Sequence, residues 1–268
     1  RKFIFSKWQE ALGGQLDFML AGSAPMQPRL IRVFTAAGIP VFEGYGMTET
    51  SPAVSVTDMR DRGFKIGTVG RVIDDVEVKI ADDGELLVKG PNTMMGYYKN
   101  PGQTNETIKN GYLHTGDIGE IDNEGFLKIT DRKKEIFKTS GGKYIAPAVL
   151  ESELKKSRFI EQVMVIGESE KMPAALIQIS FEFVYEWAKR HNHKISNVST
   201  DEKLIERVQK ELDYYNKKFG KWEQIKRFEI TSDEWTTDAG HLTPTLKMRR
   251  KIILEKYNDL HKKIYNSQ

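Results

Sequence analysis

The chain has 268 residues, of which 39% are hydrophobic, and this length and composition predict two domains with buried cores rather than a disordered chain. Its 41 basic and 38 acidic residues nearly cancel and are dispersed, which argues against a basic platform for nucleic acid. The absence of cysteine excludes a disulfide framework, a cysteine nucleophile and a thiolate metal site, and no apolar run approaches the roughly 18 residues of a membrane span.

The first residues, RKFIFSKWQE, contain no initiator methionine, and their apolar core is too short for a signal peptide. We therefore expect the sequence to start inside a longer chain. The first elements follow in the order strand, helix, strand: a buried strand at 16–22 (LDFMLAG), a helix at 28–38 (PRLIRVFTAAG) closed by Gly38, and a short strand at 39–42 (IPVF). This order predicts a parallel crossover.

Two hairpins are predicted next, within 76–90 around Asp83–Gly84 and within 119–130 around Glu124–Gly125, and they indicate a small β-rich subdomain. Near residue 130 the pattern becomes α+β. The elements expected there are helices at 146–157 (opening at Pro147), 181–191, 202–219 and 247–265, and strands at 162–167, 174–180 and 225–231.

The octet EGYGMTET follows the strand at 39–42, where open α/β sheets bind ligands. Gly44 and Gly46 permit close backbone approach or a positive φ, and Tyr45 offers a flat ring for a nucleobase. Thr48 offers a hydroxyl to a phosphate oxygen, and Glu49 offers a hard oxygen ligand to Mg²⁺. A solvated turn with a helix cap is the alternative, and the octet alone does not decide between them.

The order of four segments along the chain decides between a ligand-binding segment and a solvated turn. These segments are 44–50 (GYGMTET), 112–122 (YLHTGDIGEID), 129–147 (ITDRKKEIFKTSGGKYIAP) and 242–252 (LTPTLKMRRKI). This set closely resembles the superfamily of AMP-forming acyl-CoA synthetases, luciferases and peptide-synthetase adenylation domains, and the resemblance extends over nearly the whole chain from LAGSAPM onward. The motif style is most similar to long-chain fatty-acid–CoA ligases. Short-chain and peptide-synthetase members usually carry glycine before the C-terminal motif lysine, where this chain has Leu246.

The resemblance implies an α/β plus α+β fold. Residues 1–131 would form the rear part of the large adenylate-forming domain, with a parallel α/β sheet and a β-rich subdomain. Residues 132–268 would form a small mobile α+β lid domain. The hinge would lie near Lys134, by its position after Arg132. A hinge needs only a few residues that absorb a change in φ and ψ.

The resemblance also implies the nucleotide contacts. Gly22, Ser23 and Ala24 would line the adenine, Tyr45 between Gly44 and Gly46 would stack on it, Thr48 would hold the α-phosphate, and Glu49 would bind Mg²⁺. Asp117 would accept hydrogen bonds from both ribose hydroxyls, a task that suits an acceptor-only carboxylate, and Arg132 would reach the ribose or phosphate. The alternative for Asp117 is a turn residue after Gly116.

Two further segments receive roles from the resemblance. Gly141 and Gly142 would contact CoA, although a flexible β-turn between two strands explains these glycines equally well. Lys247 matches the C-terminal catalytic lysine, whose ammonium would stabilise the charge that develops during attack on the α-phosphorus. The alternative is that Lys247 belongs to an exposed basic face at the start of the last helix.

The implied reaction uses a fatty acid, ATP and CoA, with Mg²⁺, to form an acyl-adenylate and then a thioester. The phosphate-binding loop of the family is absent from these residues, so we expect the chain to be a C-terminal portion that has little or no ligase activity alone. We further expect a cytoplasmic location with peripheral membrane contact through the lipid substrate, and self-association through exposed apolar surface.

Three rival functions remain open. A luciferase-like or peptide-synthetase-type adenylation enzyme is the nearest rival. A non-catalytic nucleotide-binding module would retain Tyr45, Asp117 and Arg132, although the presence of both Glu49 and Lys247 argues against it. A nucleic-acid-binding protein would use the basic runs KMRRK and DRKKE, but these runs lack interleaved aromatic residues.

Overall fold

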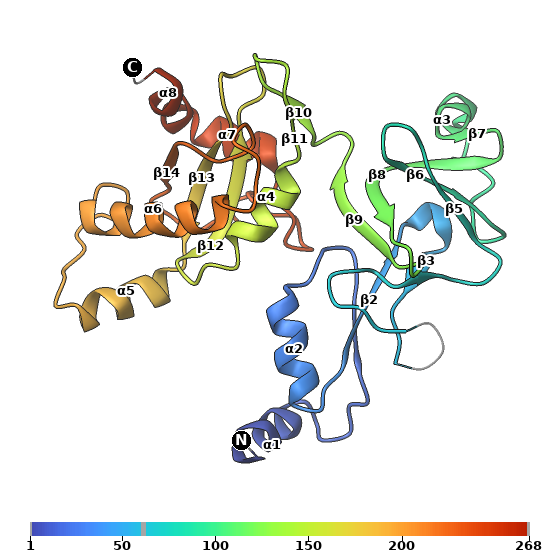
Figure 1. The fold of residues 1–268 in the computed structure, drawn as a ribbon, viewed down its shortest axis with the longest axis horizontal. Helices are drawn as coiled ribbons and strands as arrows, with labels where there is room; N and C mark the ends of the chain where they lie inside the picture. The colour runs from blue at the N-terminus through green and yellow to red at the C-terminus, as the bar shows by residue number, and fades with distance from the viewer. Residues whose placement is uncertain (1, 60–62, 267–268) are drawn as a thin grey trace. The chain divides into compact units, whose positions relative to one another are not determined.

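The computed structural model describes residues 2–59 and 63–266, and the chain divides into two compact units (Figure 1). Unit 1 comprises Arg1–Lys133 and unit 2 comprises Lys134–Gln268. The sequence analysis set this boundary after residue 131, and the expected hinge residue Lys134 is the first residue of unit 2. Among the described residues, no helix is both long enough and apolar enough to cross a membrane.

Unit 1 opens with a four-stranded sheet in the order β1-β2-β3-β4. The elements of this part are α1 (Lys2–Ala11), β1 (Met19–Ala21), α2 (Pro28–Ala36), β2 (Val41–Gly46), the 3₁₀ turn η1 (Thr48–Thr50), β3 (Ala53–Val56) and β4 (Arg71–Val72). Strands β1 and β2 are parallel, which confirms the predicted crossover, and β2, β3 and β4 continue antiparallel. Helix α2 begins with its proline and is followed by Gly38 at φ +79°, as predicted.

Two details of this sheet correct the sequence analysis. The strand expected at 16–22 to be buried is short, and its neighbourhood is open: Phe18 is 52% exposed and Leu20 is 64% exposed. β1 is also the edge strand of its sheet, with no described strand on its outer side. The octet expected to be a loop begins as strand, because β2 continues to Gly46 and pairs with β3 on its far half.

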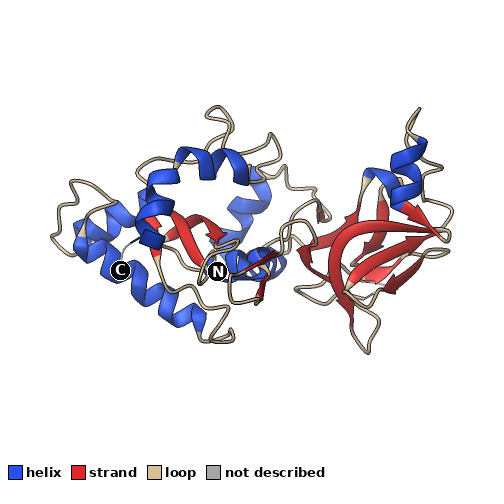
Figure 2. Cartoon of the chain, turned by 90° about the horizontal axis from the view of Figure 1, so that it is seen from above, coloured by secondary structure: helices blue, strands red, loops and turns tan. Residues whose placement is uncertain are grey.

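A five-stranded antiparallel sheet forms the rest of unit 1 (Figure 2, strands in red). It contains β5 (Glu77–Ile80), β6 (Glu85–Lys89), β7 (Ile108–Lys109), β8 (Tyr112–Ile121) and β9 (Leu127–Arg132), with α3 (Pro101–Thr107) before β7. Both predicted hairpins are confirmed, since β5 pairs with β6 and β8 pairs with β9. Val54 from the first sheet and Val88 and Leu113 from the second form one buried cluster, so the two sheets share a core.

Unit 2 is built on a three-stranded sheet, β12-β13-β14, with both faces covered. Its elements are β10 (Phe137–Lys138), β11 (Tyr144–Ile145), α4 (Pro147–Leu154), β12 (Ile160–Ile166), β13 (Ala174–Ile179), α5 (Phe181–Arg190), α6 (Glu202–Asn216), β14 (Phe228–Ile230), α7 (Arg250–Lys256) and α8 (Asn258–Asn266). Val165 and Ile177 join a core with Leu204 of α6, whereas Met164 and Leu176 join another with Ile253 of α7. Burial on both faces explains why β12 and β13 read as continuous apolar runs.

The last helix differs from the prediction of one helix over 247–265. It begins only at Arg250 and is divided into α7 and α8 at Tyr257, which has φ −102° and ψ 27°. The side chain of Tyr257 packs in the core of that sheet face, and its hydroxyl donates a hydrogen bond of 2.8 Å to Asp233. This anchoring fixes the bend between the two helices.

Candidate nucleotide site

Three of the predicted site residues meet in unit 1, on three different strands. Tyr45 of β2 donates a hydrogen bond of 2.7 Å from its hydroxyl to Oδ2 of Asp117 on β8. Arg132 of β9 donates from Nε to Oδ1 of the same carboxylate at 3.0 Å, and the two residues face each other across the β8–β9 pair. An ionised carboxylate is acceptor-only and has about four acceptor sites, so its chemistry also suits a further donor pair such as a ribose diol.

The environment keeps Tyr45 a neutral donor. Burial raises the pKa of Tyr45 most, and the charge of Asp117 and the hydrogen bond to it raise the pKa further. The ring is partly buried against the core cluster of Val54, Val88 and Leu113. Tyr45 is therefore anchored through its hydroxyl and through part of its ring.

Asp117 lies in an irregular part of β8 and not in a turn. Its backbone amide donates to Oγ1 of Thr115 at 3.1 Å, and that hydroxyl donates to the carbonyl of Leu86 on β6 at 2.9 Å. Gly116 has φ +72°, a conformation that glycine adopts without strain. Asp117 is 7% exposed, so its carboxylate is presented from within the sheet.

Glu49 lies in η1 and is held by a different partner. The hydroxyl of Tyr97 donates to Oε1 of Glu49 at 2.9 Å, and the amide of Met94 donates to its backbone carbonyl at 2.8 Å. Burial, followed by the hydrogen bond and charge of Glu49, raises the pKa of Tyr97. The structure records Tyr97 as the hydrogen-bonding partner of the Glu49 carboxylate, outside the trio of Tyr45, Asp117 and Arg132.

The donor set around Glu49 fits Mg²⁺ only together with a ligand. The described residues contain no group of three His, Cys, Asp or Glu side chains that could hold a metal ion. Proteins commonly bind Mg²⁺ through one or two carboxylates plus substrate phosphates, and a single hard oxygen ligand satisfies that pattern.

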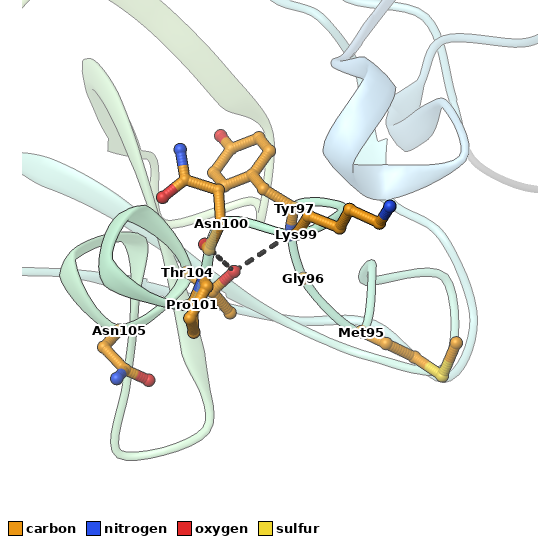
Figure 3. Close-up of a pocket in the computed structure, with 8 residues that line it drawn as sticks. All are labelled: Met95, Gly96, Tyr97, Lys99, Asn100, Pro101, Thr104 and Asn105. Atoms are coloured by element: carbon orange, nitrogen blue, oxygen red, sulfur yellow. Dashed lines mark hydrogen bonds between the residues drawn. The ribbon is translucent and has the colours of Figure 1, made fainter.

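Tyr97 belongs to a loop that α3 supports, beside a shallow pocket shown in Figure 3. Its backbone amide donates to Oγ1 of Thr104 at 2.9 Å, and Thr104 donates to the carbonyl of Asn100 at 2.9 Å. The pocket is lined by Met95, Gly96, Tyr97, Lys99, Asn100, Pro101, Thr104 and Asn105. The sequence analysis missed Tyr97, because nothing local distinguishes it from Tyr98, which is 87% exposed.

The glycines of the octet serve the sheet. A Cβ on Gly46 would lie 1.7 Å from the carbonyl oxygen of Pro52, whereas a Cβ on Gly44 would lie 3.4 Å from that of Ser55. Neither glycine has a positive φ, which corrects one of the two uses expected for them. The predicted close approach is real at Gly46, but the neighbour is the chain itself. Thr48 is exposed at the start of η1.

The adenine-lining segment predicted at 22–24 runs beside β2. A Cβ on Gly22 would lie 3.6 Å from the carbonyl oxygen of Gly44, and Ser23 has φ +65°. The amide of Met26 donates to the Glu43 carboxylate at 3.3 Å, and burial raises the pKa of Glu43. Gly22, Ser23 and Ala24 are exposed in this arrangement.

Lys247 lies in unit 2 in a closed turn before α7. The amide of Thr243 donates to the Lys247 carbonyl at 2.8 Å, and the amide of Lys247 donates to Oγ1 of Thr243 at 3.0 Å. Leu246 has φ +59°, in the left-handed region that favours glycine. The side chain of Lys247 is exposed. Arg250, the first residue of α7, is not part of an exposed basic face, because its Nη2 donates to both carboxylate oxygens of Glu151 at 2.7 Å.

Gly141 and Gly142 lie in the turn between β10 and β11, the arrangement that the sequence analysis gave as the alternative. The amide of Gly142 donates to the Thr139 carbonyl at 2.9 Å, and Gly142 has φ +78°. The ammonium of Lys143 lies 5.7 Å from the ring centroid of Trp222, which is 53% exposed. An exposed ring beside a cation is a second feature that the sequence analysis did not identify.

The chain is similar to known proteins over its whole length. Family models described as AMP-binding enzyme and AMP-binding enzyme C-terminal domain match residues 3–98 and 134–268. A long-chain-fatty-acid–CoA ligase, FadD15 of Mycobacterium tuberculosis, is 38% identical over 100% of this chain and 45% of its own length. Long-chain-fatty-acid–CoA ligase 5 of Rattus norvegicus is 35% identical over 99% of this chain and 41% of its own. The chain thus spans less than half the length of these relatives.

Solved structures match as well. The adenylation domain of a carboxylate reductase from Mycobacterium chelonae superposes with a TM-score of 0.78 at 24% identity, over 99% of this chain and 41% of that one. An unliganded O-succinylbenzoate coenzyme A synthetase from Bacillus subtilis has a TM-score of 0.62 at 29% identity, over 81% of this chain and 44% of that one. The first of these likenesses concerns the fold alone.

Proposed function

The chain belongs to the AMP-binding enzyme family, and from that premise we propose that it acts as the C-terminal portion of a long-chain fatty-acid–CoA ligase. The observation that carries the proposal is the buried Asp117 carboxylate, which Tyr45 and Arg132 hold and whose acceptor-only chemistry also suits a ribose diol. The names of the similar ligases from Mycobacterium tuberculosis and Rattus norvegicus support the long-chain substrate class.

In this proposal the adenosine lies over unit 1. Gly22, Ser23 and Ala24 line the adenine, and the exposed part of the Tyr45 ring stacks on it. Asp117 accepts the two ribose hydroxyls, and the planar guanidinium of Arg132 would also donate to the oxygens beside the ribose. Because Asp117 is already anchored by two donors, its orientation costs little further order when the nucleotide binds.

The phosphates extend toward η1. Thr48 donates its hydroxyl to the α-phosphate, and Glu49 would supply a carboxylate ligand to Mg²⁺, which would neutralise charge on the nucleotide. A fatty-acid carboxylate oxygen attacks the α-phosphorus, the bond to the bridging oxygen breaks, and pyrophosphate leaves. The role of Lys247 is to stabilise negative charge on the phosphoryl oxygens with its exposed ammonium during that step.

Thioester formation follows from a second position of unit 2. Rotation about Lys134 removes Lys247 and brings Gly141 and Gly142 to the pantetheine of CoA, whose sulfur attacks the acyl carbonyl and displaces AMP. The exposed Trp222 ring with Lys143 suits an anionic nucleotide such as the adenosine end of CoA. A cytoplasmic location, with peripheral membrane contact through the lipid substrate, belongs to the same proposal.

Nucleotide binding tests the site in unit 1 directly. Titration of AMP into residues 1–268 should give saturable binding, and Asp117→Asn should raise the Kd at least about tenfold, because a hydrogen bond to a charged group contributes about 1.5 to 3 kcal/mol. Glu120→Gln is the matched control: it also alters a β8 carboxylate, but one that pairs with Lys128 on the exposed part of the sheet. Equal affinity in the wild type and Asp117→Asn would reject the assigned site.

Catalysis separates the ligase from its rivals. Residues 1–268 alone should form no acyl-CoA from oleate, ATP and CoA, because the family's phosphate loop is not among them. In a complete ligase that carries these residues, Lys247→Ala should reduce acyl-adenylate formation by at least about a hundredfold while thioester formation from supplied acyl-AMP continues. A complete protein that binds AMP but forms no adenylate would instead be a non-catalytic nucleotide-binding module.

A further inference from the structure

The strand that carries Asp117 contains a bulge. On β6 the step from Glu85 to Leu87 is two residues, but their partners on β8, Ile118 and His114, are four residues apart. The additional residues therefore lie in the segment Thr115–Asp117. A bulge locally bends the strand and re-aims its side chains, so the direction of the Asp117 carboxylate depends on how this bulge is held.

Glu85 holds the bulge from the neighbouring strand. Its Oε1 accepts a hydrogen bond of 2.9 Å from the amide of Gly116, and its Oε2 accepts from the ammonium of Lys133 at 2.9 Å. His114 Nδ1 lies 3.2 Å from the same Oε2. The amide of Lys133 in turn donates to the carbonyl of Gly116 at 2.8 Å. Gly116 directly precedes Asp117. Its amide is thus held by Glu85, and its carbonyl is held by Lys133.

The chemistry of Glu85 suits a fixed acceptor. Burial disfavours its charged form, but the hydrogen bonds from Lys133, Gly116 and His114 together outweigh burial and lower the pKa of Glu85. The residue is 5% exposed, and a carboxylate so buried is costly unless it is fully paired. Its recorded hydrogen-bonding partners are the bulge, the histidine that precedes it and the lysine that closes it. The adenosine site described above makes no direct use of this carboxylate.

We propose that Glu85 is a positioning residue for nucleotide recognition, and that it braces the β8 bulge so that the Asp117 carboxylate faces a ribose diol. This inference rests on the proposed function. It extends that function by assigning to Glu85, through Lys133 and Gly116, the preference for a ribonucleotide over its deoxy analogues. Loss of the brace leaves adenine stacking intact and removes the advantage of the ribose hydroxyls.

The test compares AMP with 2′-deoxyAMP and 3′-deoxyAMP on residues 1–268, by isothermal titration calorimetry or, for weak binding, by saturation-transfer NMR. The wild type should prefer AMP at least about tenfold, since each lost hydroxyl leaves a charged acceptor without its donor. Glu85→Gln should reduce this ratio to about two or less, because AMP loses the contribution of two hydroxyls and each deoxy analogue loses that of one. The brace is lost because the side-chain amide nitrogen of the Glu85→Gln variant would face the Lys133 ammonium, and two donors cannot form a hydrogen bond with each other.

Glu120→Gln is the matched control, because Glu120 of β8, like Glu85 of β6, is a carboxylate paired with a lysine, but it lies away from the bulge and should keep the wild-type ratio. Lys133→Gln is the second variant, and it should also lower the ratio. The Lys133 side chain is 46% exposed, so this variant should fold even where Glu85→Gln does not. Circular dichroism of each variant checks that the fold is retained.

Three results are distinguished: two overturn this inference alone, and the third rejects the proposed ribose site as well. A wild type that prefers AMP, with Asp117→Asn abolishing the preference while Glu85→Gln and Lys133→Gln keep it, overturns the inference alone. Equal loss of affinity for all three nucleotides in Glu85→Gln also overturns it, because that pattern indicates a general structural role. A wild type that binds no nucleotide, or binds all three equally, rejects the assigned ribose site and this inference with it.

Discussion

At the scale of single residues, the candidate site is formed by side chains that also hold the fold together. Tyr45 packs against the shared core of unit 1 and donates to Asp117, and Arg132 meets the same carboxylate from the next strand. These contacts satisfy a buried charge, which would otherwise be costly. They also leave the carboxylate in one orientation before any ligand arrives.

Tyr45→Phe tests this dual role. The change removes the hydroxyl that donates to Asp117 at 2.7 Å and keeps the ring, so the free energy of unfolding should fall by about 1.5 to 3 kcal/mol. Urea unfolding followed by circular dichroism measures it. Tyr98→Phe, at an 87% exposed position, should change stability by less than about 0.5 kcal/mol. A cost for Tyr45→Phe no larger than that of the control would contradict the assigned hydrogen bond.

The lowered pKa of Glu85 predicts that the free energy of unfolding depends on pH. Its pKa in the folded protein lies below the ordinary value of 4.5, because hydrogen bonds to the carboxylate outweigh burial. A depressed acid pKa contributes stability that is present above pH 4.5 and is lost as the pH falls through the lower folded value. Glu85→Gln should therefore show a shallower loss of stability than the wild type on acidification below pH 4.5, measured by urea unfolding at each pH. Parallel curves for the two proteins would oppose this assignment.

At the scale of elements, the junction of β2, η1 and β3 sets where Thr48 and Glu49 lie. The chain turns back within a few residues, and Pro52 comes against Gly46 so closely that a Cβ on Gly46 would lie 1.7 Å from the proline oxygen. Thr50 ties the turn by donating to the carbonyl of Pro52 at 2.8 Å and accepting from the amide of Met47 at 3.0 Å. Thr48 and Glu49 therefore depend on a backbone contact that only glycine permits.

Gly46→Ala tests this contact. The added methyl group must displace backbone and not a flexible side chain, so we expect a loss of at least about 3 kcal/mol in the free energy of unfolding of unit 1. Gly141→Ala is the matched control: its Cβ would meet only Thr139 Oγ1 at 4.0 Å, and its φ is not positive, so the change should stay within about 0.5 kcal/mol. Thermal and urea unfolding measure both variants, and similar effects at the two glycines would count against the structural reason given for Gly46.

At the scale of the whole molecule, each unit has its own core. The cluster of Val54, Val88 and Leu113 belongs to unit 1, whereas the two clusters on either face of the β12–β14 sheet belong to unit 2. Separate cores of this kind predict separate unfolding transitions.

Leu204→Ala tests the independence of the two cores. Leu204 of α6 is fully buried in unit 2, and its truncation should cost about 2 to 5 kcal/mol, lowering the Tm of that transition by about 5 to 15 °C. The transition is identified as the one that residues 134–268 show alone. Lys203→Ala, exposed on the same helix, should leave both transitions unchanged. A single transition that shifts as a whole in calorimetry would indicate one cooperative molecule.

Unit 1 also carries exposed apolar side chains in α1, in β1 and in the segment that joins them, namely Ile4, Trp8, Leu12, Leu16, Phe18 and Leu20. The self-association predicted from the sequence stays a prediction, and these residues are its natural surface. The sedimentation coefficient of the wild type should rise with protein concentration, and Leu20→Lys should weaken that rise. A concentration-independent monomer in the wild type would count against it.

For the elements that it predicted, the sequence alone determined order and type, because these follow from local backbone preferences; α1, β3, β4 and α3 were not predicted. Gly84 and Gly125 adopt the positive φ values that their hairpin turns require, and Pro147 opens α4 as expected. The motifs also identified Tyr45, Asp117 and Arg132 as one site, through resemblance and not through any local rule. The undivided last helix was wrong because the anchoring of Tyr257 in a core is a long-range contact.

Only the tertiary structure decided how the site is held together. Tyr45 and Asp117 are 72 residues apart, and their 2.7 Å contact exists because the two sheets share a core. Glu85 and Tyr97 carried no signal beyond being an acidic and an aromatic residue in strand and loop segments. Their partners follow from strand register, from the bulge in β8 and from the support of α3, which depend on packing across the fold.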